Sequence, residues 1–371
     1  MLRPVAITGI GLASSQGEGR AVHAALLGGA APVLDEARFA PYPVHPLAPL
    51  PFDAAIPRRE MRQMENWQRL GVYTAGLAID DAGLRERVAG MDLIVAAGGG
   101  ERDWKLDEQI MAASPGEVER HRMLLDGLRP TLFLAQLSNL MAGSISITHN
   151  VAGSSRTLMG EEIAGAEAMR IAAARVATGT SELSLAGSAF IAERPEVLML
   201  FAMGRLLHRG PWAPVAARGG IAYGSIGSFL TFEPAATSRP IAILRHIATD
   251  QGPPAGRAAR LAALLAATPT PAADCLRFSA ASGAEEATRA ELAALGVAPD
   301  LFTADLLGHG CKAAFPAALA LAALAIQSGR ARQVLVTSTG PWRGEAVALL
   351  EAPPREDTPR REDTPPREDK P

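Results

Sequence analysis

The chain has 371 residues, of which 48% are hydrophobic and 20% are charged, and its formal net charge is −3. This length gives one large domain or two fused halves, with enough residues for a substantial core. The near-neutral charge offers no basic stripe, which argues against nucleic acid as a partner. No apolar run reaches the roughly 18 residues of a membrane span, and two cysteines without CxxC or HExxH spacing support neither a disulfide framework nor a zinc site.

Short apolar runs alternate along the chain with longer, Ala-rich stretches of helical pattern. Strands bounded by Gly or polar residues are expected at 5–10, 93–97, 183–186, 229–232, 241–244 and 334–338. Helices are expected at 68–82, 161–178, 256–267, 285–295 and 313–328. Nearly all-apolar strands that alternate with helices predict an α/β protein whose sheets are covered on both faces.

Breaks in this alternation suggest the domain organisation. The segment AATSRP at 235–240 precedes a fresh strand and divides the chain into halves, 1–237 and 238–352. The proline-rich stretch at 34–57 is expected to be irregular, and the charged helical segment at 102–129 resembles an insertion. The repeat PPREDTPRREDTPPREDKP at 353–371 has no apolar side chain to bury, so we expect a disordered tail that is either solvated or a docking peptide.

The sequence lacks the motifs of two common classes of enzyme. ITGIG follows the first strand and invites a dinucleotide interpretation, but Ser14 occupies the third glycine position of GxGxxG. No tyrosine is followed four residues later by lysine, and no GxSxG nucleophile elbow occurs. We therefore expect no nicotinamide cofactor and no serine hydrolase. The opening VAITGIG carries no leader pattern, so a soluble cytoplasmic protein is expected.

Three other positions are candidates for chemistry. Glu162, after Glu161, opens an Ala-rich helix, where the dipole favours a carboxylate by about 0.3–1 kcal/mol, although an ordinary N-terminal charge explains it equally well. His309 lies in the Gly-flanked turn LGHGC and is either an oxyanion or carboxylate partner or a packed histidine. Cys311 is either a thiolate at a helix N-terminus or a buried, inert thiol. A mechanism that requires lysine has only three candidates: Lys105, Lys312 and Lys370.

Taken together, these segments resemble the β-ketoacyl-acyl-carrier-protein synthases, a family of the thiolase fold. The family's opening strand, Gly-rich turn and first helix are similar to VAITGIGLASSQGEG with HAALLGG. Its next helix is similar to LGVYTAGLAIDDAGL, and the strand that follows is similar to LIVAAGGG. Residues 139–189 resemble the nucleophile region, and LGHGCKAAFPAALALAALAIQSG resembles the histidine turn with its helix. The resemblance spans about residues 3–350 and implies αβαβα layers built from two related halves.

The family's catalytic residues are mostly replaced in this sequence. The resemblance places the nucleophilic cysteine at Glu162, the first catalytic histidine at Ala281 and the lysine at Ala304, whereas His309 retains the second histidine. The closing G-F-G-G loop becomes GPWRGE at 340–345. A carboxylate cannot replace the thiolate, because it would hold the acyl chain as an unstable anhydride. The resemblance thus implies a catalytically degenerate subunit, with no catalytic residue expected.

Chain-length factors of type II polyketide systems, and related subunits of aryl polyene systems, are such members. The resemblance implies a heterodimer with an active ketosynthase, contact with acyl carrier protein through that complex, a role in shaping the acyl tunnel, and no cofactor or metal. Residues 129–141 would lie near the interface, with Phe133 and Met141 either facing the tunnel or interface or packed in the core. Whether the chain is an enzyme on its own is left open.

Two alternatives stay open at this point. The first is a divergent acyltransferase or decarboxylase of the same fold that uses Glu162 and His309, together with Cys311. The second is a homodimeric protein that binds acyl carrier protein or an acyl group.

Overall fold

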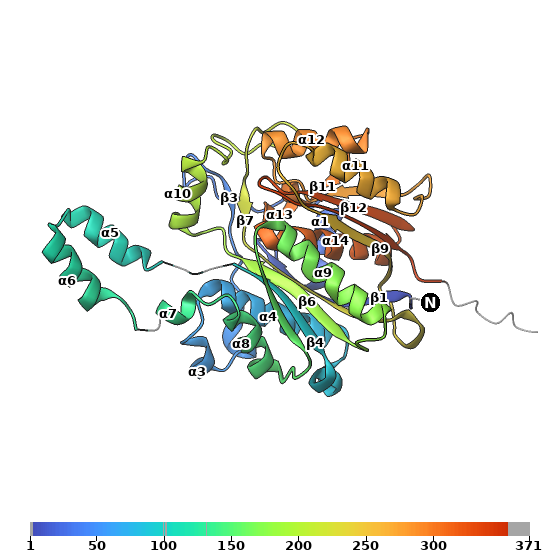
Figure 1. Cartoon of the computed structure of the whole chain (residues 1–371), viewed down its shortest axis with the longest axis horizontal. Coiled ribbons are helices and arrows are strands. Elements are labelled where there is room, and N and C mark those ends of the chain that lie inside the picture. The colour runs from blue at the N-terminus through green and yellow to red at the C-terminus, as the bar shows by residue number, and fades with distance from the viewer. Residues whose placement is uncertain (1–2, 99, 101, 131, 355–371) are drawn as a thin grey trace, which may run out of the picture.

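The computed structural model describes residues 3–354 except 99, 101 and 131 (Figure 1). The described residues form an 11-stranded sheet in the order β11-β10-β12-β13-β9-β1-β8-β6-β4-β5, with β2 (Gly17–Glu18) beside β1. The first half contributes β1 (Val5–Ser14), β4 (Asp92–Ala97), β5 (Ser155–Met159), β6 (Ser184–Phe190) and β8 (Ile226–Pro234). The second half contributes β9 (Ala242–Asp250), β10 (Leu276–Ser279), β11 (Leu301–Phe302), β12 (Gln333–Thr339) and β13 (Glu345–Glu351).

The two halves repeat one strand order. When the five strands named above for each half are counted in chain order, both halves arrange them across the sheet as third, second, fourth, fifth and first. This order is β5-β4-β6-β8-β1 in the first half and β11-β10-β12-β13-β9 in the second. The fifth strand, β8 or β13, runs antiparallel to both of its neighbours, whereas the second strand is parallel to the third and the fourth. The halves meet where β1 pairs antiparallel with β9. The expected α/β fold of two related halves is therefore confirmed.

Helices α9 (Glu162–Ala177) and α14 (Ala314–Gln327) form the middle layer. They pack against each other, and each also contacts strands of both halves. Every residue of α14 from Ala314 to Ile326 is buried, as expected for a helix that is apolar on all sides. Its many alanines keep the side-chain layer thin, so the flanking strands lie close to the helix backbone.

The outer helices cover the faces of the strands that point away from the middle layer. In the first half, α4 (Asn66–Asp81) packs on β1, β6 and β8, and α8 (Leu140–His149) packs on α4. In the second half, α11 (Arg257–Ala267) packs on β13 and α12 (Glu285–Leu295) on β12. The order outer helix, strands, middle helices, strands, outer helix gives the expected αβαβα arrangement.

Shorter elements connect these layers, and most of them lie at the ends of strands. The remaining helices are α1 (Gly19–Leu27), α2 (Phe52–Ala55), α3 (Arg58–Met61), α7 (Leu132–Ala135), α10 (Pro195–Met203) and α13 (Thr303–Leu307), with 3-10 turns η1 (Arg85–Gly90), η2 (Ala235–Thr237) and η3 (Cys311–Ala313). Strands β3 (Val44–His45) and β7 (Tyr223–Gly224) pair with each other. The stretch at 34–57, expected to be irregular, holds only a few short elements.

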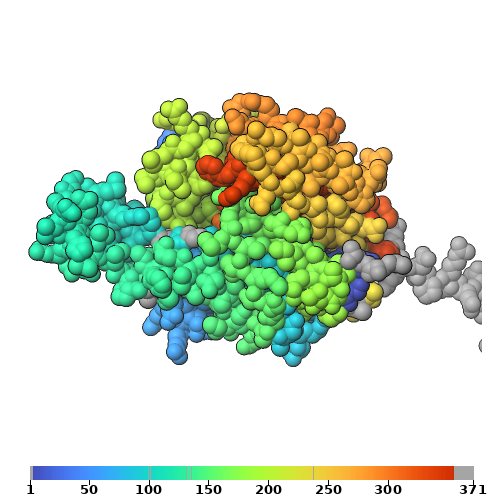
Figure 2. All heavy atoms as spheres, viewed as in Figure 1, coloured from blue at the N-terminus to red at the C-terminus, as the bar shows by residue number. Residues whose placement is uncertain are grey.

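The charged insertion is a helical hairpin. Helices α5 (Trp104–Ala113) and α6 (Glu117–Gly127) project from one end of the body (Figures 1 and 2). The division at 237/238 is kept as a proposal, which the interruption of strand structure between β8 and β9 supports. Most of the predicted tail, 355–371, lies outside the described residues. Across the described ranges, no helix is long and apolar enough to cross a membrane.

Gly165 in the first turn of α9 tests the packing of the middle layer. A Cβ at this position would lie 1.8 Å from the carbonyl oxygen of Lys312. We expect Gly165→Ala to lower the free energy of unfolding by about 1–3 kcal/mol, because backbone must move to admit the methyl group. Urea denaturation of the purified protein measures this change.

Gly143, inside α8, is the matched control because a Cβ there meets open space. Gly143→Ala is expected to raise stability by about 0.5–1 kcal/mol through helix propensity alone. If both variants were equally stable, the close approach of α9 to Lys312 would not be a packing constraint.

Candidate functional site

A carboxylate and an imidazole meet in the middle of the molecule. The Nε2 atom of His309 lies 2.9 Å from Oε1 of Glu162, within hydrogen-bond distance. The two residues are only 1% and 3% exposed, respectively. Glu162 begins α9 in the first half of the chain, whereas His309 precedes α14 in the second half. The site therefore joins the two halves, and it pairs two of the residues that the sequence selected.

Backbone contacts hold the histidine turn in place. The His309 N–H donates to the carbonyl of Ala222 at 2.9 Å, and the Gly224 N–H donates to the His309 carbonyl at 3.1 Å. A Cβ at Gly224 would lie 1.8 Å from the Leu307 carbonyl oxygen, and Gly308 has a φ of +72°. Glycine is needed at both positions because the two segments pass too closely for a side chain.

Several polar atoms around this pair have no hydrogen-bond partner among the described residues. They are the second oxygen of Glu162, Nδ1 of His309 and the hydroxyl of Tyr223. The Tyr223 ring lies 5.8 Å from the His309 ring, centroid to centroid. Burial raises the pKa of Tyr223 well above its ordinary value, and the nearby Cys311 and Glu162 add to the effect. The Tyr223 hydroxyl is therefore protonated at neutral pH.

The replaced catalytic positions also come together. Ala281 and Ala304 are both buried and form a small apolar cluster with Val215, to which Phe302 adds its ring. Methyl groups provide neither a proton nor a hydrogen bond to a reacting carbonyl. Ala281 and Ala304, at which the sequence predicts the positions of the first histidine and the lysine, therefore lie together in an apolar environment.

A buried arginine next to this cluster was missed by the sequence analysis. The Arg218 side chain is completely buried, and its guanidinium lies 4.0 Å from Oδ1 of Asp305 and 3.5 Å from the Ser282 carbonyl. Burial lowers the pKa of Arg218 to about 10. His45 is also buried, and burial together with Arg218 lowers its pKa to about 3, so the imidazole is neutral. No local pattern in the sequence marks either residue as buried.

Cys311 is a buried thiol. It adopts a φ of +51°, and burial raises its pKa to about 11 although the neighbouring Lys312 opposes the shift. Such a group is almost wholly protonated at neutral pH and is a poor nucleophile. The geometry supports the inert alternative for Cys311.

The two tunnel or interface candidates lie in different environments. Phe133, on α7, is 69% exposed. Met141, on α8, is fully buried, and its sulfur would lie 2.1 Å from a Cβ on Gly71, so it fills the space that this glycine leaves. Core packing accounts for Met141 within this chain, whereas Phe133 is available to a partner. A role in a tunnel stays a prediction for both.

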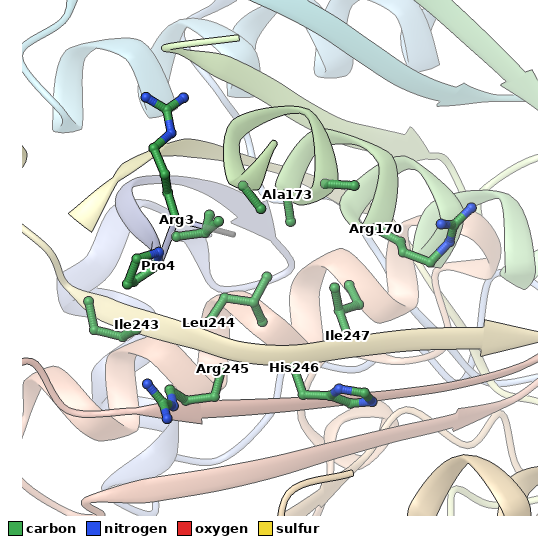
Figure 3. A pocket seen from close by; sticks show the side chains of 12 residues that line it. Arg3, Pro4, Arg170, Ala173, Ile243, Leu244, Arg245, His246 and Ile247 are labelled. Atoms are coloured by element: carbon green, nitrogen blue, oxygen red, sulfur yellow. The ribbon is translucent and has the colours of Figure 1, made fainter. Parts of the chain in front are cut away.

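A separate groove of about 440 Å³ lies between α9 and β9 (Figure 3). Arg3, Arg170 and Arg245 line it but extend in different directions. They are also paired with the carboxylates of Glu182, Glu167 and Glu351, respectively. The groove therefore offers no convergent charged site. The described part of the chain likewise contains no cluster of three His, Cys, Asp or Glu residues that could hold a metal ion.

Comparison with known proteins agrees with this fold. Residues 49–224 match the family model "Beta-ketoacyl synthase, N-terminal domain". Over 195 residues the chain is 29% identical to the tetracenomycin polyketide synthase ketoacyl synthase beta subunit of Streptomyces glaucescens. That match covers 50% of this chain and 45% of the relative, so it spans about half of each protein.

Solved structures show the same fold over nearly the whole chain. The ishigamide ketosynthase/chain length factor superposes with a TM-score of 0.76 at 20% identity, covering 95% of this chain and 100% of that one. A β-ketoacyl synthase from Burkholderia phymatum gives a TM-score of 0.77 at 16% identity with the same coverage. A type II polyketide ketosynthase in complex with its acyl-carrier protein gives 0.72 at 15% identity, again covering 95% and 100% of the two chains.

Residues 49–224 are thus similar to the N-terminal domain of β-ketoacyl synthases, and the chain has the thiolase-like fold of the ketosynthase class. Within that class it is similar to proteins named as the beta subunit or chain length factor of polyketide synthases.

The raised pKa of Cys311 gives a test of the site. At pH 8 its thiolate population is expected to be about a hundredfold lower than that of a cysteine with the ordinary pKa of 9.0. Burial also raises the pKa of Cys275. Ellman's reagent should therefore label neither thiol rapidly in the native protein at pH 8, while both react at once in guanidinium chloride. One fast native thiol, mapped to Cys311 by mass spectrometry, would make that cysteine a reactive group.

Proposed function

We propose that the chain is a non-catalytic, chain-length-factor-type subunit. It forms a heterodimer with an active β-ketoacyl-ACP synthase, shapes the acyl tunnel of that partner during chain elongation and meets acyl carrier protein through the complex. The observation that carries this proposal is the buried hydrogen bond between Glu162, at the nucleophile position, and the retained His309. A type II polyketide or aryl polyene system in the cytoplasm is the setting that we infer.

The chemistry of condensation supports a non-catalytic role. Condensation needs a nucleophile that holds the acyl chain as a stable intermediate and donors that stabilise the developing oxyanion. An acylated Glu162 would be an anhydride, which water hydrolyses readily. Ala281 and Ala304 offer no donor, because both lie in an apolar cluster. One histidine bonded to a carboxylate does not replace this set.

The surface near β5 supports a partner. β5 is the last strand at its end of the sheet, and its residues are exposed or half-buried. An open edge is a template for pairing with another chain. Large apolar side chains are exposed on β5, on α8 and on α7: Met159, Ile147 and Phe133, respectively. Exposed apolar side chains of this size in neighbouring elements are typical of protein interfaces.

One observation favours a second function. The Glu162–His309 pair is a buried carboxylate–imidazole couple, and such a couple can move a proton in a decarboxylase or acyltransferase. A homodimeric protein that binds acyl carrier protein or an acyl group is the remaining alternative. Native mass of this chain alone, and with a ketosynthase encoded beside it, separates the heterodimer from the homodimer.

Glu162→Gln separates the non-catalytic role from the enzymatic one. The amide keeps a hydrogen bond to His309 but cannot act as a base. In a complex with an intact ketosynthase, we expect product formation to stay within about twofold of wild type. A fall of about a hundredfold or more, with the complex still assembled, would instead make Glu162 catalytic. Substitution of the partner's nucleophilic cysteine is the positive control for lost activity.

Phe133→Asp tests the interface. An unpaired carboxylate buried against a partner costs several kcal/mol, so the heterodimer should weaken by about a hundredfold or more in analytical ultracentrifugation. Val297→Asp is the matched control, because Val297 is also an exposed apolar residue but follows α12 in the second half. If the two variants assembled equally well, Phe133 would not lie in the interface.

A further inference from the structure

Lys312 is a buried lysine that has no ion-pair partner among the described residues. The residue is only 8% exposed. Its Nζ lies 3.9 Å from the sulfur of Cys311 and 5.7 Å from the centroid of the Phe190 ring. No carboxylate of the described residues, which do not include Glu101, forms an ion pair with it. A thiol and an aromatic face are weak partners, and an uncompensated buried charge is costly.

The backbone around Lys312 increases this cost. Lys312 belongs to η3, immediately before the N-terminus of α14. Its carbonyl oxygen also lies against Gly165 in the first turn of α9. Helix N-termini carry partial positive charge from unpaired N–H groups. The backbone of Lys312 thus lies beside two helix N-termini, and that of α9 already carries Glu162 in its first turn.

The ammonium group lies beside a cavity. The cavity has a volume of about 300 Å³, and both Lys312 and Cys311 line it. The Nζ lies beside Gly98, 2.9 Å from the point where a Cβ would stand, and near the Phe190 ring. Gly98 and Phe190 are themselves lining residues. The charged end of Lys312 therefore faces the cavity.

The other charged groups of the cavity are already paired. Arg194 donates to Glu196 at 2.8 Å and to the Gly100 carbonyl at 2.6 Å. The Glu161 carboxylate forms an ion pair with Arg343, with Oε2 at 3.5 Å from the guanidinium, although this oxygen accepts no hydrogen bond from the described residues. Lys312 is thus the charged residue of the described lining that forms no ion pair with another described residue. Most of the remaining wall is apolar and aromatic: Trp67, Phe190, Ile191, Val197 and Phe201.

We propose that this cavity binds an amphipathic carboxylate. The carboxylate pairs with the Lys312 ammonium, and a short aliphatic chain lies against the aromatic and aliphatic wall. The size is at the lower end of the range for small-molecule sites, which fits a short chain. This inference does not depend on the proposed heterodimer, because every group that it uses belongs to this chain.

Octanoate is the probe, and its binding to the purified full chain is measured by calorimetry and by the shift in Tm. We expect octanoate to raise the Tm, whereas 1-octanol and inorganic phosphate at the same concentration give little or no shift. Equal effects of octanoate and octanol would show a purely apolar cavity and overturn the proposal. Equal effects of octanoate and phosphate would show a simple anion site, and no effect of octanoate would show no site; both overturn it too.

Lys312→Met identifies the group responsible. A charge-assisted hydrogen bond in a buried site is worth about tenfold or more in affinity, so we expect the Kd for octanoate to rise by at least that factor. Without ligand, this variant should have a Tm equal to or above that of wild type, because methionine removes an uncompensated charge at similar volume. Unchanged affinity in a folded Lys312→Met protein overturns the proposal.

Lys105→Met is the matched control, because Lys105 is exposed on α5. It removes the same charge from the surface and should leave the Kd unchanged. An equal loss of affinity in both variants would point to net charge rather than to the cavity, and would also overturn the proposal. Heterodimer formation is measured separately, so failure of one proposal leaves the other intact.

Discussion

The contact between the beginning of α9 and the turn before α14 is the constraint on which the site depends. Gly165 allows α9 to touch the Lys312 carbonyl, and this approach brings Glu162 within hydrogen-bond distance of His309. The two residues are 147 positions apart and come from different halves of the chain. Any side chain larger than hydrogen at position 165 would separate the halves at the point where their polar groups meet.

Burial then determines what these polar groups can do. The Glu162 carboxylate and the His309 imidazole share one buried hydrogen bond beside a protonated tyrosine and a protonated thiol, while the second Glu162 oxygen and His309 Nδ1 have no hydrogen-bond partner among the described residues. The neighbouring positions Ala281 and Ala304 have become part of the hydrophobic core. In this chain the Glu162–His309 contact connects the two halves, and the non-catalytic, partner-directed role that we propose rests on this contact.

The surface has a different character at the two ends of the molecule. Apolar side chains are exposed on α7, α8 and β5 at one edge of the sheet, and the α5–α6 hairpin projects from the body near the same region (Figure 1). The groove between α9 and β9 has paired charges instead. The apolar edge is the surface at which we propose the partner, whereas the charges of the groove are paired within the chain.

The sequence by itself determined the strand and helix alternation and the two halves, and it selected Glu162, Ala281, Ala304 and His309 as candidate site residues. Apolar periodicity and Gly-flanked turns are local signals, and the elements they predict form nearly where expected. The tertiary structure decided which of these residues touch. The Glu162–His309 bond, the buried Arg218 and the unpaired charge of Lys312 arise from contacts between segments far apart in the chain. Burial and counter-ions are properties of those contacts, so no local pattern could reveal them.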